Sequence, residues 1–355
     1  MKKMIAGLLL ASSILVLPGC AREPAPPETT QAQATAPSEA TAETETPAVE
    51  GSLFLKVSSI TFSLVGEQED IYLGLVPREL VTWESADPSV VSVENGVLTA
   101  KGVGTTTIRA TYSDRQVVCT AGCLAETREA LDGLDPQVLS APKRLPPQVD
   151  LEAPCTYFDN AAIFGDSITY FLWQSESQNN YLGDLQFVTR QGVSILGLVR
   201  RNKNLHFRGQ EMYVEDIAAQ CGAQRIYLAL GCLDFQYEAG RDSLMDSWNT
   251  MLDRITEKCP DVELVILSNI PCYTERTTSP EMNDFISASN VRLRALAAER
   301  GCGFLDLGYY IQDHYGRMPA IYSKDDFHMN DEGSLAWMRI MRFYAQYEQE
   351  GGTLS

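Results

Sequence analysis

The stretch AAIFGDSIT, residues 161–169, decides the fold of the C-terminal part of this 355-residue chain. Its first four residues are apolar and predict a short buried strand, and Gly165 permits the sharp turn that follows. Ser167 then falls at the start of the next helix, where free backbone N–H groups and the helix dipole favour negative charge. An oxyanion would be stabilised there, although a Gly-Asp-Ser triplet on its own is common in turns.

Downstream of this stretch, short apolar strands alternate with helices. Strands are expected at residues 161–164, 186–189, 225–230, 263–269 and 304–307, and helices at 211–221, 242–258, 281–300 and 331–347. In the second of these helices, Leu244, Trp248 and Ile255 share one face at helical spacing. This alternation predicts a parallel sheet with helices on both faces, a three-layer α/β/α domain whose site lies beyond the carboxyl ends of the strands.

A second group of polar residues, DDFH at residues 325–328, lies immediately before the last predicted helix, which Asn330 can cap. A loop here can place Asp325 and His328 over the first strand. His328 could then accept the proton of Ser167 while Asp325 orients and stabilises the imidazolium. An isolated histidine is usually structural, but this position before the final helix favours a catalytic role. His206 and His314 have no comparable context.

Together these features resemble the SGNH (GDSL-like) hydrolase family over about residues 155–350. The first block of that family matches Gly165-Asp166-Ser167, and its last block, Asp-x-x-His, matches Asp325 and His328. The resemblance implies a flavodoxin-like α/β/α domain, a serine hydrolase that acts on ester bonds, and Ser167, Asp325 and His328 as catalytic residues. It implies no metal and no cofactor.

The two middle blocks of the family concern the oxyanion hole, and one of them departs from the pattern. The second block is expected to supply the N–H of Gly192, with Gly197 as a weaker candidate, beside the N–H of Ser167. In the third block, Gly-x-Asn-Asp becomes Gly231-Cys232-Leu233-Asp234, so the side-chain amide is replaced by Leu233. Loss of one such donor typically costs about 100- to 1000-fold in rate, which leaves much of the catalysis in place.

The resemblance implies a serine esterase. Together with the export signal at the N-terminus, it favours short acyl groups on extracellular carbohydrate as substrates, with lipids or acylated peptides still open. Trp173, Tyr237 and Tyr273 could line a substrate cleft, or simply pack in the core or lie on the surface. The alternative is a surface-displayed binding or scaffold protein in which Leu233 marks the loss of activity.

The N-terminus is typical of an exported lipoprotein. Residues 1–20 combine two lysines, an apolar run too short to span a bilayer, and LPGC at residues 17–20. This ending resembles a bacterial lipobox, in which Cys20 receives a diacylglycerol whose two chains suffice for anchoring to the outer face of the cell membrane. An ordinary signal peptide or a buried apolar helix are the alternatives. Residues 21–50 are rich in Ala, Pro, Thr and Glu and predict a disordered linker.

Residues 51–123 change to short β-type runs separated by turn signals, expected at 60–64, 70–75, 80–83, 90–93, 105–112 and 116–119. The segments WESADP (83–88), Asn95-Gly96 and KGVGT (101–105) resemble the group 2 bacterial Ig-like domain, a small all-β sandwich used as a spacer or adhesion module. Asn95-Gly96 predicts a two-residue hairpin turn. Residues 124–154 are expected to form a linker.

Charge and cysteine content limit the possible partners. A formal charge of −19 at pH 7 would repel phosphate backbones, so nucleic acid is not expected as a partner. Eight cysteines follow Cys20. Cys119 and Cys123 could close a small loop, and small buried hydrophobes are expected at Cys221, Cys232, Cys259, Cys272 and Cys302. The three histidines are scattered and no C-x-x-C occurs, which argues against zinc.

Overall fold

A computed structural model of the chain describes residues 51–202, 204–273 and 280–354. The predicted signal peptide, Cys20 and the predicted linker at residues 21–50 lie outside these residues. Val49–Ser355 form one compact unit, and everything below concerns that unit. Within the described ranges, no helix has the length and apolar character needed to cross a membrane.

The C-terminal part is organised around a five-stranded sheet in which every strand pair is parallel. The strand order is β10-β9-β13-β14-β15, so the first strand in sequence lies between the second and the third, as in flavodoxin-like folds. The strands are β9 (Ala161–Gly165), β10 (Gln186–Thr189), β13 (Arg225–Ala229), β14 (Glu263–Leu267) and β15 (Gly303–Leu305). All five predicted strands are present, within a few residues of the predicted bounds.

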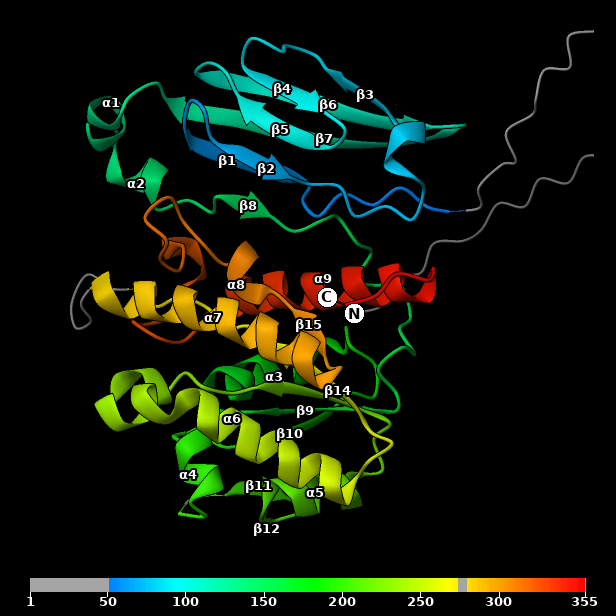
Figure 1. Ribbon diagram of the computed structural model, residues 1–355, viewed down its shortest axis with the longest axis vertical. Coiled ribbons are helices and arrows are strands. Elements are labelled where there is room, and N and C mark those ends of the chain that lie inside the picture. Colours follow the sequence, from blue (N-terminus) through cyan, green and yellow to red (C-terminus); the bar gives the residue numbers. More distant parts are fainter. Residues whose placement is uncertain (1–50, 203, 274–279, 355) are drawn as a thin grey trace, which may run out of the picture. The chain divides into compact units, whose positions relative to one another are not determined.

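Helices cover both faces of this sheet (Figure 1). They are α3 (Ser167–Asn179), α4 (Ile195–Val199), α5 (Val214–Cys221), α6 (Glu238–Lys258), α7 (Pro280–Arg300), α8 (Leu307–Tyr310) and α9 (Asp331–Gln349). Odd-numbered residues of the central strands, such as Ile163 and Val265, pack with α3, α8 and α9. Even-numbered residues, such as Phe164 and Ile266, pack with α4 to α7. The predicted three-layer α/β/α arrangement is therefore confirmed.

One helix prediction was wrong at its start. Residues 211 and 212 belong not to a helix but to a small hairpin formed by β11 (Leu205–Phe207) and β12 (Gln210–Met212). The left-handed backbone of Arg208 and Gly209 makes the turn, and α5 begins only at Val214. Residues 211–213 are compatible with a helical pattern but do not specify one.

The N-terminal part contains two sheets, of order β3-β6-β7-β1-β8 and β2-β5-β4. Their strands are β1 (Ser59–Leu64), β2 (Gln68–Asp70), β3 (Thr82–Ser85), β4 (Val91–Glu94), β5 (Val97–Ala100), β6 (Gly104–Tyr112), β7 (Arg115–Ala125) and β8 (Arg144–Leu145). Asn95 and Gly96 have φ of 49° and 81° and join β4 to β5, which confirms the predicted hairpin turn. The run expected at 70–75 forms a strand only up to Asp70, and Arg78–Leu80 form a 3-10 helix.

The segment at residues 124–154 is folded. It contains α1 (Arg128–Asp132), α2 (Pro136–Leu139) and β8, which pairs with β1. The small Cys119–Cys123 loop does not form, because both residues lie in the extended β7, where four residues span about 13 Å. Within the described ranges all eight cysteines are free thiols.

Buried contacts join the β-rich part to the α/β part. Arg144, in β8, pairs with Glu69 at 2.6 Å, and its guanidinium lies 4.2 Å from the centre of the Tyr309 ring. Phe54 makes edge contacts with Phe343 and Tyr347 of α9, at 5.8 and 5.5 Å between ring centres. The two parts therefore share a packed apolar and ionic interface.

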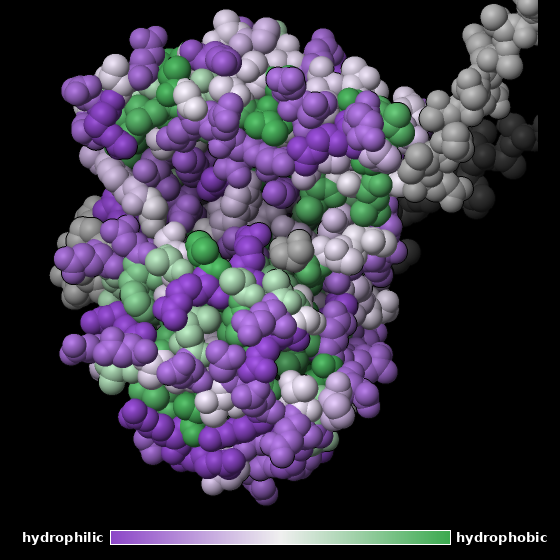
Figure 2. Space-filling view, in the orientation of Figure 1, coloured by the Kyte–Doolittle hydropathy of each residue, from purple (hydrophilic) through white to green (hydrophobic). Residues whose placement is uncertain are grey.

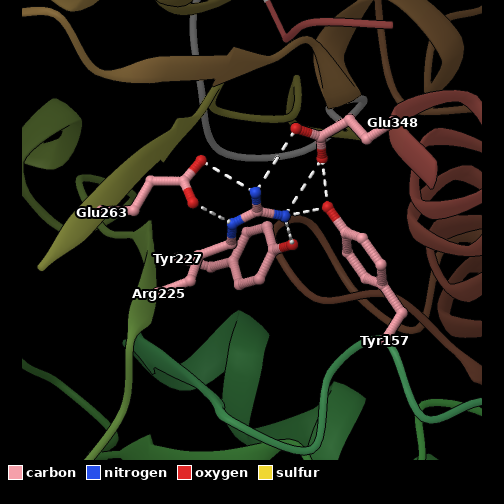
Figure 3. A network of polar contacts seen from close by, with 5 residues as sticks. All are labelled: Tyr157, Arg225, Tyr227, Glu263 and Glu348. Carbon is pink, nitrogen blue, oxygen red and sulfur yellow. Dashed lines mark hydrogen bonds and ion pairs between the residues drawn. The ribbon is translucent and has the colours of Figure 1, made fainter. Parts of the chain in front are cut away.

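A polar network at the amino ends of the strands holds the far end of α9 (Figure 3). Arg225, the first residue of β13, pairs with Glu263 of β14 at 2.8 Å and with Glu348 of α9 at 3.1 Å. Tyr157 hydrogen-bonds both Arg225 and Glu348. Burial raises the pKa of Glu348 to about 7. This network lies at the opposite edge of the sheet from Ser167 and fixes the helix that follows His328.

The face of the molecule in Figure 2 is largely hydrophilic, with its apolar residues scattered among polar ones. The strongly negative formal charge of −19 agrees with such a surface.

Candidate active site

The structure brings Ser167, His328 and Asp325 together at the carboxyl edge of the sheet. Ser167 Oγ lies 2.9 Å from His328 Nε2. On the other side of the ring, His328 Nδ1 lies 2.9 Å from Asp325 Oδ2 and 3.0 Å from Oδ1. The side chains of His328 and Asp325 are 24% and 50% exposed, so a substrate can reach them from solvent. These distances fit a nucleophile, a base and an orienting acid.

Ser167 is placed by the turn from β9 into α3. Ser167 is the first residue of α3, and Asp166 caps the helix by accepting the N–H of Ile168 at 3.0 Å. A Cβ at Gly165 would lie 2.0 Å from Thr169 Oγ1. Glycine is thus needed because α3 packs so closely on β9, and this contact gives the serine a fixed position at the helix N-terminus.

The loop that carries Asp325 and His328 is held by Asn330. The Asn330 side chain accepts the N–H of Gly333 at 3.0 Å, which confirms the predicted cap of α9. Its amide group also donates to the carbonyls of Ile321 at 2.8 Å and Ser323 at 3.2 Å. One side chain therefore fixes both the start of α9 and the beginning of the loop.

Asp325 is held as a carboxylate. Its partial burial opposes the charged form, but hydrogen bonds from the N–H groups of Phe327 and His328 and from the His328 ring lower its pKa. Both N–H groups lie 2.9 Å from Oδ1. Because a carboxylate only accepts hydrogen bonds, His328 Nδ1 must carry the proton, which leaves the lone pair of Nε2 directed at Ser167.

Two buried aspartates tie the blocks of the site together, and sequence reasoning gave neither of them a role. Asp166 accepts the N–H of Cys232 at 3.2 Å, and burial raises its pKa to about 7. Asp234 is fully buried and accepts the N–H groups of Ile195 at 2.8 Å and Leu196 at 3.0 Å. Burial also raises the pKa of Asp234. Their position in the first and third blocks was the available signal.

The structure gives the two candidate glycines of the second block different surroundings. Gly192 is exposed, has φ of 67° and lies in the turn between β10 and α4, whose first two N–H groups donate to Asp234. The N–H of Gly197 donates to Ser194 Oγ at 2.9 Å as part of the cap of α4. Gly197 is therefore already engaged, and Gly192 stays the better candidate for an oxyanion-hole donor.

Leu233 is partly exposed and stands at the start of the 3-10 helix Asp234–Gln236. Its side chain has no hydrogen-bond donor, so position 233 cannot supply the side-chain amide that the family has there.

Aromatic side chains of α3 lie beside the site. The Phe171 ring makes an edge contact with His328 at 4.9 Å, and Lys324 Nζ lies 3.7 Å from the same ring. Trp173 is 41% exposed and lies 5.6 Å from Tyr170, ring centre to ring centre. Phe171 was missed by sequence reasoning, although it follows Ser167 by one helical turn. Tyr237 is also exposed, whereas Tyr273 is partly buried.

The other two histidines lie away from Ser167. His206 is an exposed residue of β11. His314 lies 2.9 Å from Ser63 Oγ, and burial lowers its pKa to about 4. Across the described part of the chain, no three His, Cys, Asp or Glu side chains cluster as metal ligands would.

The model of the GDSL-like Lipase/Acylhydrolase family matches residues 163–336. Those residues, which include the Ser167, Asp325 and His328 cluster, form a GDSL-like lipase/acylhydrolase (SGNH) domain. No curated protein matches the chain.

Several solved structures are similar to this chain. A GDSL-like lipase from Bacteroides thetaiotaomicron is 14% identical over 54% of this chain and 89% of its own, with a TM-score of 0.41. The C-terminal catalytic domain of a peptidoglycan O-acetyltransferase from Streptococcus pneumoniae is 12% identical over 56% of this chain and 98% of its own, with a TM-score of 0.39. A carbohydrate esterase family 3 protein from Talaromyces cellulolyticus is 14% identical over 53% and 98%, with a TM-score of 0.37.

Proposed function

We propose that this protein is a serine esterase whose nucleophile is Ser167. The observation that carries the proposal is the continuous chain of hydrogen bonds from Ser167 Oγ through the His328 ring to Asp325. Ser167 has a base, His328 Nε2, at 2.9 Å and lies at the N-terminus of a helix, and a nucleophile that attacks a carbonyl needs both features.

The reaction follows from these positions. His328 Nε2 takes the proton from Ser167 Oγ as the oxygen attacks the ester carbonyl. The tetrahedral intermediate collapses when His328 returns that proton to the leaving alcohol, which leaves an acyl group on Ser167. Water then attacks the acyl-enzyme with His328 as base, and the acid is released. Asp325 stabilises the imidazolium in both halves of the reaction.

The negative oxygen of both tetrahedral intermediates would lie at the N-terminus of α3. The backbone N–H of Ser167 and, from the second block, the N–H of Gly192 are the donors that this proposal assigns to it. Both belong to backbone that other groups hold in place, Asp166 in one case and Asp234 in the other. Such donors need no reorganisation when charge develops.

The proposed substrates are short acyl esters on extracellular carbohydrate. Support comes from Trp173, which is 41% exposed, and the partly exposed Tyr170 on the helix that begins at Ser167, since such rings can bind the apolar face of a sugar. The rival proposal is a binding or scaffold protein that no longer catalyses, and Leu233 is the observation in its favour. The intact hydrogen bonds between Ser167, His328 and Asp325 favour the esterase.

Turnover of a small acetyl ester by the purified protein tests the proposal. Ser167→Ala and His328→Ala are expected to lower kcat by several orders of magnitude each, because these residues act as a unit, and Asp325→Ala less. A Ser167→Ala protein with wild-type turnover would show that the nucleophile is wrong. A folded wild type without turnover on a panel of acyl esters would favour the scaffold.

We also propose that the protein is exported and anchored to the outer face of the cell membrane through Cys20. The support is the sequence of residues 1–20, with LPGC at its end. Cys20→Ser should abolish metabolic labelling with a lipid precursor and release the protein from the membrane fraction. Unchanged membrane association would contradict the lipid anchor.

A further inference from the structure

A buried amide without a partner lies two strands away from Ser167. Asn269 follows β14 and is only 9% exposed. Among the residues that the structure describes, none hydrogen-bonds its Nδ2. A buried amide that forms no such bond destabilises the fold, so its presence calls for another explanation.

The strand register places Asn269 in one row with the nucleophile. Ala229 of β13 pairs with Gly165 of β9, and Leu228 pairs with Ile266 of β14. Ser167, Gly231 and Asn269 each come two residues after the end of β9, β13 and β14, and they form a row along the carboxyl edge of the sheet, with Ser167 as the first residue of α3. All three follow the carboxyl ends of adjacent parallel strands, where ligands bind in folds of this kind.

The side-chain amide of Asn269 lies over Gly231, the middle residue of that row. A Cβ on Gly231 would lie 2.9 Å from Asn269 Oδ1 and 3.2 Å from Nδ2, and Gly231 has φ of 125°. The amide thus fills the space that a side chain at position 231 would take. Leu267, the last residue of β14, and Ile270, which follows Asn269, both pack on the side of α3 and α9.

The backbone of Asn269 is fixed from α7. Asn290 Oδ1 accepts the N–H of Asn269 at 2.8 Å, and Asn290 Nδ2 donates to the carbonyl of Asn269 at 2.7 Å. Two turns earlier in α7, Asn283 binds both backbone groups of Cys272 in the same way, at 2.8 and 3.0 Å. The backbone of the segment after β14 is therefore held at two points, whereas Asn269 Nδ2 has no partner among the described residues.

We propose that Asn269 donates its side-chain amide to the oxyanion, in place of the amide that is missing at Leu233. The inference rests on the esterase activity proposed above. The terminal amide torsion is broad and roughly two-fold, and Nδ2 forms no hydrogen bond within the described part of the chain, so the amide can turn its N–H groups toward the charge. The donor then comes from β14, one strand farther from Ser167 than the third block of the family.

Asn269→Ala tests this assignment on the purified full chain with an acetyl ester. We expect kcat to fall about 100- to 1000-fold with little change in KM, because the bond exists only when the oxyanion has formed. The melting temperature should stay the same or rise, since the lost amide has no partner in the fold. A merely structural asparagine would instead lower the melting temperature and leave the kcat of the folded fraction unchanged.

A second substitution makes the result specific. Leu233→Asn should restore at least about tenfold of the kcat lost in Asn269→Ala. Asn269→Asp keeps the shape but removes the donor, and should lose at least as much kcat as Asn269→Ala. An active wild type whose kcat survives both Asn269 substitutions would overturn the assignment, as would a kcat loss matched by unfolding and not rescued at position 233. A wild type without esterase activity would instead overturn the proposed function.

Discussion

Replacing Asp234 by alanine should show how much the buried carboxylate contributes to the site. Asp234 is fully buried, and its two oxygens accept the N–H groups of Ile195 at 2.8 Å and Leu196 at 3.0 Å. Each N–H left buried without an acceptor costs about 1–3 kcal/mol, which gives roughly 2–6 kcal/mol for the pair. Burial of the Asp234 carboxylate also costs free energy, as its raised pKa indicates. Removing the carboxylate removes that cost and offsets part of the loss. The net loss expected is about 2–4 kcal/mol.

Thermal unfolding followed by circular dichroism measures this loss. For a domain of this size, about 2–4 °C of melting temperature corresponds to each kcal/mol, so Asp234→Ala should melt roughly 4–16 °C lower. Asp234→Asn keeps one acceptor oxygen and should lose about half as much. kcat should fall as well, because the start of α4, which follows the turn at Gly192, loses its two acceptors.

Asp135→Ala is the matched control. Asp135 makes the same kind of bond, to the N–H of Gln137 at 2.9 Å, but at an exposed helix start where water can replace it. Its loss should be about 1 kcal/mol or less. Equal losses at the two positions, or no loss at Asp234, would refute the reasoning from burial.

Three further predictions concern the interface and the histidine loop. Burial and the charge of Lys143 lower the pKa of His314 to about 4, against 6.5 in the unfolded chain, so the free energy of unfolding falls as pH falls from about 6.5 toward 4. His314→Asn should make the melting temperature less dependent on pH across that range, and an unchanged dependence would contradict this. Arg144→Met leaves the partly buried Glu69 carboxylate without its partner and should cost about 3 kcal/mol in urea unfolding, with Glu69→Gln recovering part; additive losses would contradict the pairing. Asn330→Ala removes the cap of α9 and should cost about 1–2 kcal/mol and lower kcat, whereas unchanged values of both would show that the loop is held by other groups.

The elements that sequence reasoning found are those with a local signal. The alternation of apolar strands and helices predicted all five strands of the parallel sheet, and the Asn95-Gly96 turn predicted its hairpin, because each depends on neighbouring residues. Ser167, Asp325 and His328 were chosen through spacing within blocks, and the fold brings them within hydrogen-bond reach.

The elements that sequence reasoning missed depend on contacts between residues far apart. Asp234 bonds to residues 38 and 39 positions earlier, and Asn269 reaches the row of Ser167 only through the register of three strands. Likewise, β8 joins a sheet through β1, some eighty residues earlier, so nothing in its own two residues predicted a strand. Register and long-range pairing are set by packing, which a single sequence does not display.

Covalent labelling of Ser167 tests the central claim most directly. A serine-reactive phosphonate should add its mass once to the purified protein, and peptide mapping should place the adduct on Ser167. His328→Ala should slow the labelling strongly, since His328 Nε2, at 2.9 Å, is the group that removes the proton from Ser167 Oγ. Absence of any adduct on a folded protein, or an adduct on a different serine, would contradict the assignment of Ser167 as nucleophile.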